Sequence, residues 1–133
     1  MKTKSIKQKI LFKTSPHEVY DALMDSKKHT KFTGATAKIS RNINGKFSVY
    51  DGYAFGKNLE LVPDKKIVQT WRASDWEEGI NSQVVFEITP AKNGCTLIFT
   101  QTDVPDKHFS SIKQGWVDFY WVPMKKMFEI VKK

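Results

Sequence analysis

Residues that build metal and redox sites are scarce in this 133-residue sequence. Its one cysteine, Cys95, can form neither an intrachain disulfide nor a thiolate metal cluster, so a reducing, cytoplasmic location is expected. The histidines, His17, His29 and His108, have no metal-ligand partner at helical spacing. We therefore expect no metal site and no other bound cofactor.

The short motifs of common catalytic sites are also missing. No glycine-rich phosphate loop follows a strand, and the sequence has no Gly-x-Ser-x-Gly nucleophile elbow. Cys95 opens a predicted strand after a tight turn, which favours a structural thiol over a catalytic Cys–His pair. Glu77 and Glu78 are adjacent in a predicted loop and do not define an acid–base pair. The sequence therefore does not predict an enzyme.

Long apolar runs and arginine are rare as well. The apolar run near the N-terminus, residues 10–12, is too short for a signal peptide core or a membrane span. The net charge is +8, yet Arg41 and Arg72 are the only arginines and the lysines are scattered. Because guanine reading and phosphate clamping favour arginine, a solvated surface is favoured over nucleic-acid binding. The charge does favour an acidic partner surface.

Aromatic residues are abundant instead, with nine Phe, four Trp and four Tyr. Large flat side chains of this kind build cores and are unusual in disordered segments. The length fits one domain, residues 1–133, that can bury a core without disulfides.

The hydrophobic periodicity predicts an α+β domain. Residues 4–13 alternate as a strand, and two short helices follow it, ending near Gly34. Alternation dominates residues 35–102, with a hairpin turn at Asn93-Gly94. We therefore expect a curved antiparallel sheet of six or seven strands, followed by a long helix from about Lys107.

The predicted last helix carries a continuous apolar stripe. Its large side chains recur at spacings of three and four, at Phe109, Ile112, Trp116, Tyr120, Met124, Met127, Phe128 and Val131. Burying each contributes roughly 1.5–3 kcal/mol, so the helix must pack across the sheet. Pro123 lies inside the pattern, and we expect a kink there.

This stripe has two interpretations. A filled core is favoured, but methionine and aromatic side chains also line ligand pockets, so an apolar cavity between helix and sheet is the alternative. The residues assigned to such a cavity are Phe47, Val49, Phe86, Phe99, Trp116, Tyr120, Met124 and Met127.

The most unusual local feature is the stretch of residues 71–79, in which two tryptophans bracket a polar segment. In one interpretation Trp71 is core and Trp76 covers a loop. In the other, Trp76 is partly exposed beside Arg72 and contacts a partner, because tryptophan and arginine are common in interface hot spots. The sequence favours neither.

These residues resemble the W-R-x-x-x-W-x-x-G pattern in the C-terminal domain of activators of the ninety-kilodalton heat-shock chaperone ATPase. Further similar segments follow in the expected order along nearly the whole chain: Phe32-Thr33-Gly34-Ala35, Gly45-Lys46-Phe47, Asp51-Gly52, residues 61–68, and Gln114-Gly115-Trp116 with Tyr120. The resemblance implies a helix-grip domain of the START-like superfamily, in which a curved antiparallel sheet grips a long C-terminal helix.

The resemblance also implies a function. The family's C-terminal domain contacts the nucleotide-binding domains of the dimeric chaperone and helps them close. We therefore expect a non-catalytic co-chaperone of the stress response that favours the closed state, with Arg72, Trp76 and Lys113 at the partner surface.

Two departures from the family pattern predict weak stimulation of the ATPase by this chain on its own. The full-length co-chaperone has a further N-terminal domain, whereas this sequence starts at the first strand of the C-terminal domain. Glu77 also stands where the family usually has proline. The alternative function is a carrier or sensor of a small apolar ligand.

Overall fold

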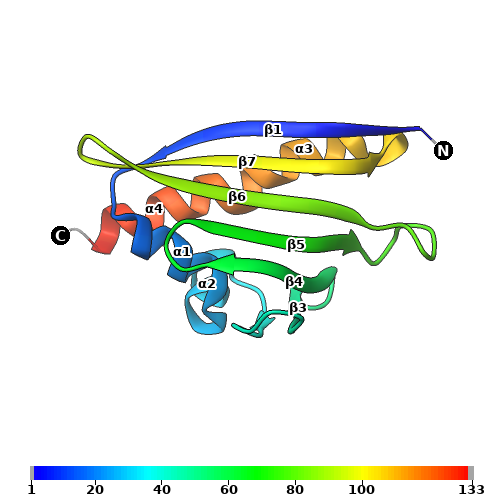
Figure 1. The fold of residues 1–133 in the computed structure, drawn as a ribbon, viewed down its shortest axis with the longest axis horizontal. Coiled ribbons are helices and arrows are strands. Elements are labelled where there is room, and N and C mark those ends of the chain that lie inside the picture. Colours follow the sequence, from blue (N-terminus) through cyan, green and yellow to red (C-terminus); the bar gives the residue numbers. More distant parts are fainter. Residues whose placement is uncertain (1, 132–133) are drawn as a thin grey trace.

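The structure, a computed structural model, describes residues 2–131. A seven-stranded antiparallel sheet curves around a long C-terminal helical segment, as the sequence predicts (Figure 1). The strands stand in the order β1-β7-β6-β5-β4-β3-β2. Their bounds are β1 (Thr3–Phe12), β2 (Lys38–Ile39), β3 (Lys46–Val49), β4 (Ala54–Val62), β5 (Lys66–Ala73), β6 (Ser82–Ala91) and β7 (Gly94–Pro105).

Two short helices, α1 (Pro16–Met24) and α2 (Ser26–Thr33), follow the first strand. The Ser15 hydroxyl accepts a hydrogen bond from the Glu18 N–H at 3.3 Å, and Asp25 caps α2 in the same way at Lys28. Gly34 ends α2 with φ of 75°, a conformation that costs glycine little. Local capping therefore explains where both helices begin and why the second ends.

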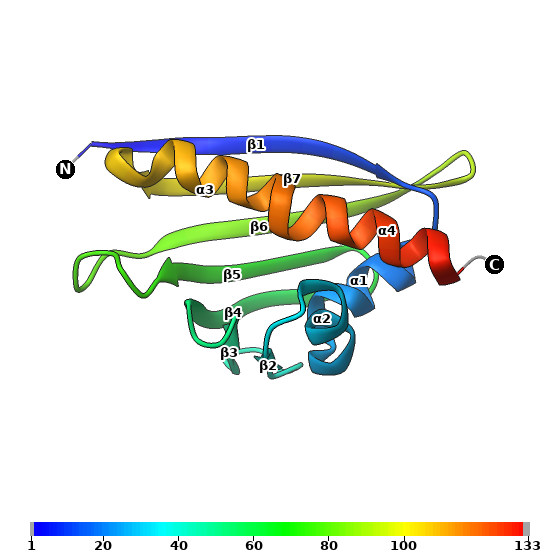
Figure 2. The ribbon, with the colours of Figure 1, turned by 180° about the vertical axis from the view of Figure 1, so that it is seen from behind.

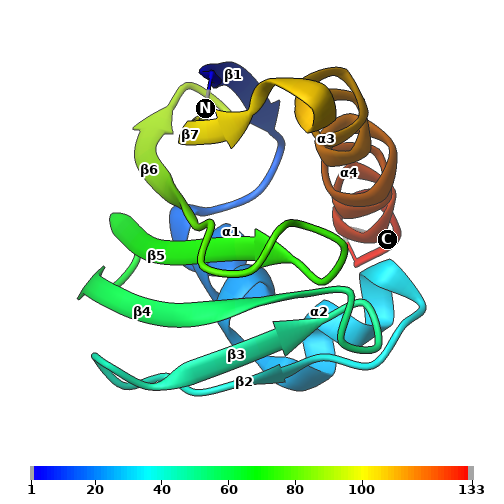
Figure 3. The same ribbon diagram turned by 90° about the vertical axis from the view of Figure 1, so that its right-hand side faces the viewer.

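The C-terminal helical segment lies across the concave face of the sheet (Figures 2 and 3). It consists of a 3₁₀ turn (Asp106–His108), α3 (Phe109–Trp116), a π-helical segment (Val117–Trp121) and α4 (Val122–Val131). The π segment lies immediately ahead of Pro123, where we expect a kink. Pro123 has no N–H for the Phe119 carbonyl, and the Tyr50 hydroxyl donates a hydrogen bond to that carbonyl instead.

Trp116 lies at the centre of the core between helix and sheet. Its ring centroid is 4.4 Å from that of Phe99, 4.5 Å from that of Tyr120 and 5.6 Å from that of Trp71. Its Nε1–H donates to Gln101 Oε1 at 2.8 Å. The indole is 3% exposed, so both its apolar surface and its polar atom are buried and satisfied.

A buried histidine lies beside this aromatic cluster. His29 of α2 is 3% exposed, and its Nε2 is 2.9 Å from the Tyr120 hydroxyl. Burial lowers the pKa of His29 to about 4 and raises the pKa of Tyr120 well above its usual value. The imidazole is therefore neutral in the folded protein at physiological pH.

Replacing Trp116 by alanine should destabilise the fold by about 3–5 kcal/mol, because it removes a large buried ring and leaves a cavity. The measurement is denaturant unfolding. Phe119→Ala, on the same helical segment but 57% exposed, is the matched control and should cost much less. A loss of under about 1 kcal/mol for Trp116→Ala would show that this side chain is not a core residue.

The stability of the protein should fall as the pH is lowered from about 6.5 towards about 4. The unfolded chain protonates His29 near its ordinary pKa of about 6.5, whereas the folded protein resists protonation down to about 4. This difference in the pKa of His29 contributes on the order of 3 kcal/mol to the free energy of unfolding, and the contribution is fully present above pH 6.5. Urea unfolding across this range should show a smaller loss of stability in His29→Gln than in the parent. Parallel losses in the parent and in His29→Gln would rule out this assignment.

Candidate functional site

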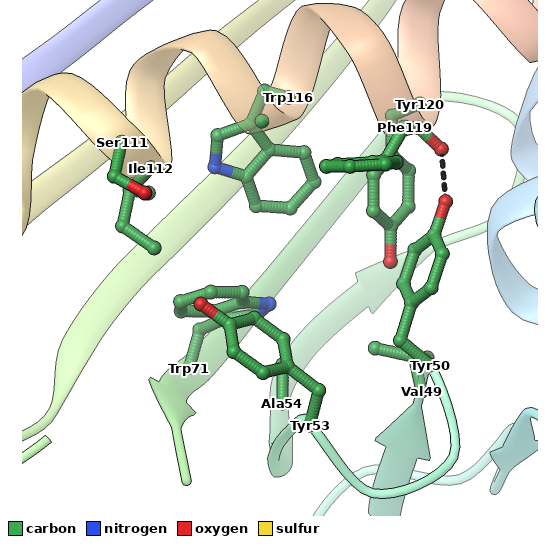
Figure 4. A pocket seen from close by; sticks show the side chains of 11 residues that line it. Val49, Tyr50, Tyr53, Ala54, Trp71, Ser111, Ile112, Trp116, Phe119 and Tyr120 are labelled. Carbon is green, nitrogen blue, oxygen red and sulfur yellow. Dashed lines mark hydrogen bonds between the residues drawn. The ribbon is translucent and has the colours of Figure 1, made fainter. Parts of the chain in front are cut away.

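A pocket of about 360 Å³ lies between α3 and the sheet, beside the turn that joins β3 to β4 (Figure 4). Its wall is almost entirely apolar. The lining residues are Val49, Tyr50, Tyr53, Ala54, Trp71, Ser111, Ile112, Gly115, Trp116, Phe119 and Tyr120.

Aromatic rings make most of this wall. Trp71 rises from the sheet, and Trp116 and Tyr120 descend from the helix on the opposite side (Figure 4). Tyr53 and Phe119 are 42% and 57% exposed and belong to the rim. Because no lining side chain carries a charge at neutral pH, the pocket suits an uncharged apolar group.

The turn between β3 and β4 forms one side of the pocket through an unusual backbone. Tyr50, Asp51 and Gly52 have successive positive φ values of 52°, 57° and 91°. Asp51 Oδ1 accepts a hydrogen bond from the Thr36 N–H at 2.7 Å, and the Tyr50 hydroxyl donates to the Phe119 carbonyl. Burial raises the pKa of Tyr50, so its hydroxyl keeps its proton for this bond. The turn is thereby tied to the helix across the pocket.

The predicted cavity residues divide between hollow and filled regions. Val49, Trp116 and Tyr120 line the pocket, and Phe47 and Phe86 line a much smaller cavity of about 20 Å³ behind it. Phe99, Met124 and Met127 do not line either of these two cavities: Phe99 and Met124 are fully buried in the core, and Met127 packs against the core.

The reason for this division lies along the helix. In the half beyond the π segment, side chains of the sheet meet the helix directly, as where the rings of Phe12 and Phe128 pack edge to face at 5.5 Å. The open space instead lies along α3, next to the small residues Ala54 and Gly115. The periodicity of the sequence missed the turn residues, because no local pattern shows that this turn reaches the helix.

Arg72 holds the loop that joins β5 to β6. Its guanidinium donates to the carbonyls of Trp76 at 2.7 Å, Glu77 at 3.0 Å and Ile80 at 3.1 Å. These bonds draw the loop backbone inward and leave residues 77–79 exposed at its tip. Arginine suits this task because its planar fork presents several donors in one rigid group.

Trp76 lies beneath this loop. It is only 4% exposed, stacks with His108 at a centroid distance of 6.0 Å and packs edge-on to Trp71 at 5.6 Å. The interpretation of Trp76 as a partly exposed residue is therefore wrong, and the interpretation that it covers a loop over a core Trp71 is correct. The exposed residues of the loop, and not Trp76 itself, are free to meet a partner.

Lys113 belongs to another element, α3, where it is exposed. Its Nζ lies 5.7 Å from the centroid of the Phe109 ring, and its backbone carbonyl accepts from Gln8. The helical segment also contacts the loop, through an ion pair of 3.2 Å between Lys107 and Glu77. The role of Arg72, Trp76 and Lys113 in partner binding stays a prediction.

Other kinds of site find little support in the part of the chain that the structure describes. Among the side chains that the structure describes, no group of three from His, Cys, Asp or Glu is placed to hold a metal ion. Within residues 2–131, no helix combines the length and the apolar character needed to cross a membrane. Cys95 is buried, and burial raises the pKa of its thiol, which disfavours the nucleophilic thiolate.

Comparison with known sequences gives agreement along most of this chain. Over 115 residues the chain is 36% identical to an activator of 90 kDa heat shock protein ATPase homolog from Dictyostelium discoideum, covering 86% of this chain and 30% of the relative. Over 126 residues it is 30% identical to the human activator homolog 1, covering 95% of this chain and 37% of the relative. The chain thus spans about a third of the length of these curated relatives.

Solved structures agree with this result. The fold matches the crystal structure of an HSP90 activator from Plasmodium falciparum with a TM-score of 0.88 and 25% identity, over 94% of this chain and 96% of that one. The Aha1 protein from Colwellia psychrerythraea has the same fold, with a TM-score of 0.83 and 19% identity over 98% and 99% of the two chains. The model of the family "Activator of Hsp90 ATPase homolog 1-like protein" matches residues 13–129, and the chain therefore belongs to this family.

Proposed function

We propose that this chain is a non-catalytic co-chaperone module that binds a chaperone of the Hsp90 class. The observation that carries the proposal is membership of the activator family over residues 13–129. The Plasmodium neighbour, which is called an HSP90 activator, also supports the proposal, because the match covers 96% of its chain. The compared part is thus nearly all of that chain, and a cytoplasmic location fits the partner.

The proposed partner surface combines the exposed tip of the β5–β6 loop with the exposed face of α3 around Lys113. Both lie at the same end of the molecule (Figures 1 and 2). Arg72 and Trp76 contribute to partner binding indirectly. They hold the loop in one shape before binding and so reduce the entropy cost of ordering it on association. The net charge of +8 would speed encounter with an acidic partner surface.

The proposed mechanism is a population shift. A module that binds the closed chaperone more tightly than the open one raises the closed fraction by the ratio of the two affinities, without any chemistry of its own. These 133 residues supply one contact surface, whereas the curated relatives are about three times as long. Because linked contacts bind more tightly than either one, we propose weak stimulation by this chain on its own.

Binding to the Hsp90 chaperone of the same organism should strengthen with a closed-state nucleotide analogue and weaken as salt rises. Exposed charges are screened over roughly 10 Å at 0.1 M salt, which gives the salt dependence. Isothermal titration calorimetry is the measurement, with ATPase assays run in parallel. Failure to detect binding at high micromolar concentration in low salt would refute the proposal.

The Arg72 loop provides the matched variants. Arg72→Lys keeps the charge but loses the fork that holds three carbonyls, and we expect binding to weaken by about tenfold. Arg41→Lys is the control, because Arg41 pairs with Asp21 outside the proposed surface. Equal weakening in both variants would show that the loop geometry is not involved.

A second candidate function is supported by the pocket itself. An apolar pocket of about 360 Å³ falls within the usual range of ligand sites, roughly 300–1,000 Å³. This observation favours a carrier or sensor of a small apolar ligand, either in place of chaperone binding or in addition to it.

A further inference from the structure

Gly115 lies in the interior of the C-terminal helical segment, where glycine is about 1 kcal/mol less favourable than alanine. Its backbone does not require glycine, since it is absent from the positive-φ residues of the described chain, 2–131. Its surroundings do not require glycine either, because a methyl group there would meet only Phe119 Cδ2, at 3.7 Å, an ordinary contact. Neither backbone conformation nor close packing explains this residue.

Other glycines of the chain show what a packing requirement looks like. A methyl group at Gly56 would lie 1.9 Å from the Thr70 carbonyl oxygen, and one at Gly94 would lie 2.0 Å from that of Phe12. At Gly115 the space in front of the backbone is instead part of the pocket. Gly115 therefore leaves open volume in the pocket, although alanine at this position would stabilise the helix.

Three polar groups of the inner wall are already occupied. Trp116 Nε1–H donates to Gln101, the Tyr120 hydroxyl is bonded to His29, and the Tyr50 hydroxyl donates to the Phe119 carbonyl. A ligand inside the pocket therefore meets mainly ring faces and aliphatic groups, with the Trp71 indole N–H as a single donor, and a charged ligand would lose most of its hydration without compensation. The hydroxyls of Ser111 and Tyr53 belong to exposed residues and suit one polar group at the mouth.

We propose that this pocket binds a small, flat, uncharged aromatic molecule and that Gly115 sets the size of ligand it admits. Trp71, Trp116 and Tyr120 offer ring surfaces from both sides, and aromatic pairs contribute about 0.5–1.5 kcal/mol beyond the area they bury. The inference rests on the second candidate function, ligand carriage, and narrows it to one ligand class.

The test uses N-phenyl-1-naphthylamine, an uncharged fluorescent aromatic probe, titrated into the whole chain. The parent protein should bind it saturably, with energy transfer from tryptophan. Gly115→Leu should weaken binding by at least about tenfold, because the leucine side chain fills the pocket. Gly115→Ala should weaken it less. Val122→Ser, in a separate surface groove beside Trp121, should leave it unchanged.

Thermal unfolding of the same variants separates blocking from misfolding. Gly115→Leu and Gly115→Ala should melt at or above the temperature of the parent, since both residues favour helix over glycine. Equal probe binding in the parent and in a folded Gly115→Leu variant would overturn the assignment of the site.

Dodecan-1-ol, an uncharged chain without a ring, serves as the second probe, measured by calorimetry. If dodecan-1-ol binds in a Gly115-dependent way and the naphthylamine does not, the aromatic class is wrong while ligand carriage stands. If neither probe binds the parent protein, ligand carriage fails with it. Naphthylamine binding that is lost in Gly115→Leu, with weaker binding of dodecan-1-ol, is the result expected.

Discussion

The hydrogen bond from the Trp116 indole to Gln101 is the interaction on which the packing of helix against sheet depends. Gln101 of β7 donates in turn to the Ser82 hydroxyl of β6 at 2.8 Å, and that hydroxyl donates to the Trp71 carbonyl of β5 at 2.6 Å. One buried chain of donors and acceptors thus joins the helix to three strands. A shift of the helix would leave these groups buried and unpaired, which is costly in a dry interior.

The same contact divides the protein into a filled half and a hollow half. Beyond Trp116 the helix continues through the π segment to Met124 and Phe128, both buried against the sheet. On the α3 side of Trp116, aromatic rings of the helix and of the sheet face each other, and the pocket occupies the space between them. Tyr50 ties the neighbouring turn to the Phe119 carbonyl, for which Pro123, four residues on, has no N–H. The turn is thereby attached to the helix at the place where the proline interrupts its regular hydrogen bonding.

Both candidate functions draw on this hollow end. Trp71 lines the pocket, and the next residue, Arg72, supports the β5–β6 loop. The Ser74 N–H of that loop donates to the Tyr53 carbonyl at the pocket rim, at 2.6 Å. The proposed partner surface and the pocket are therefore neighbours built on one strand end.

Local signals let the sequence by itself determine the order of the elements, the antiparallel sheet and the family. Alternation, capping at Ser15 and the hairpin turn at Asn93-Gly94 each act within a few residues, so no distant contact is needed to interpret them. Only the tertiary structure decided that Trp76 turns inward, because its burial depends on Arg72 and His108. Only the tertiary structure also decided which part of the apolar stripe is hollow. Periodicity reports which side of a helix is apolar, whereas a cavity depends on whether the opposite surface reaches it, and at Gly115 it does not.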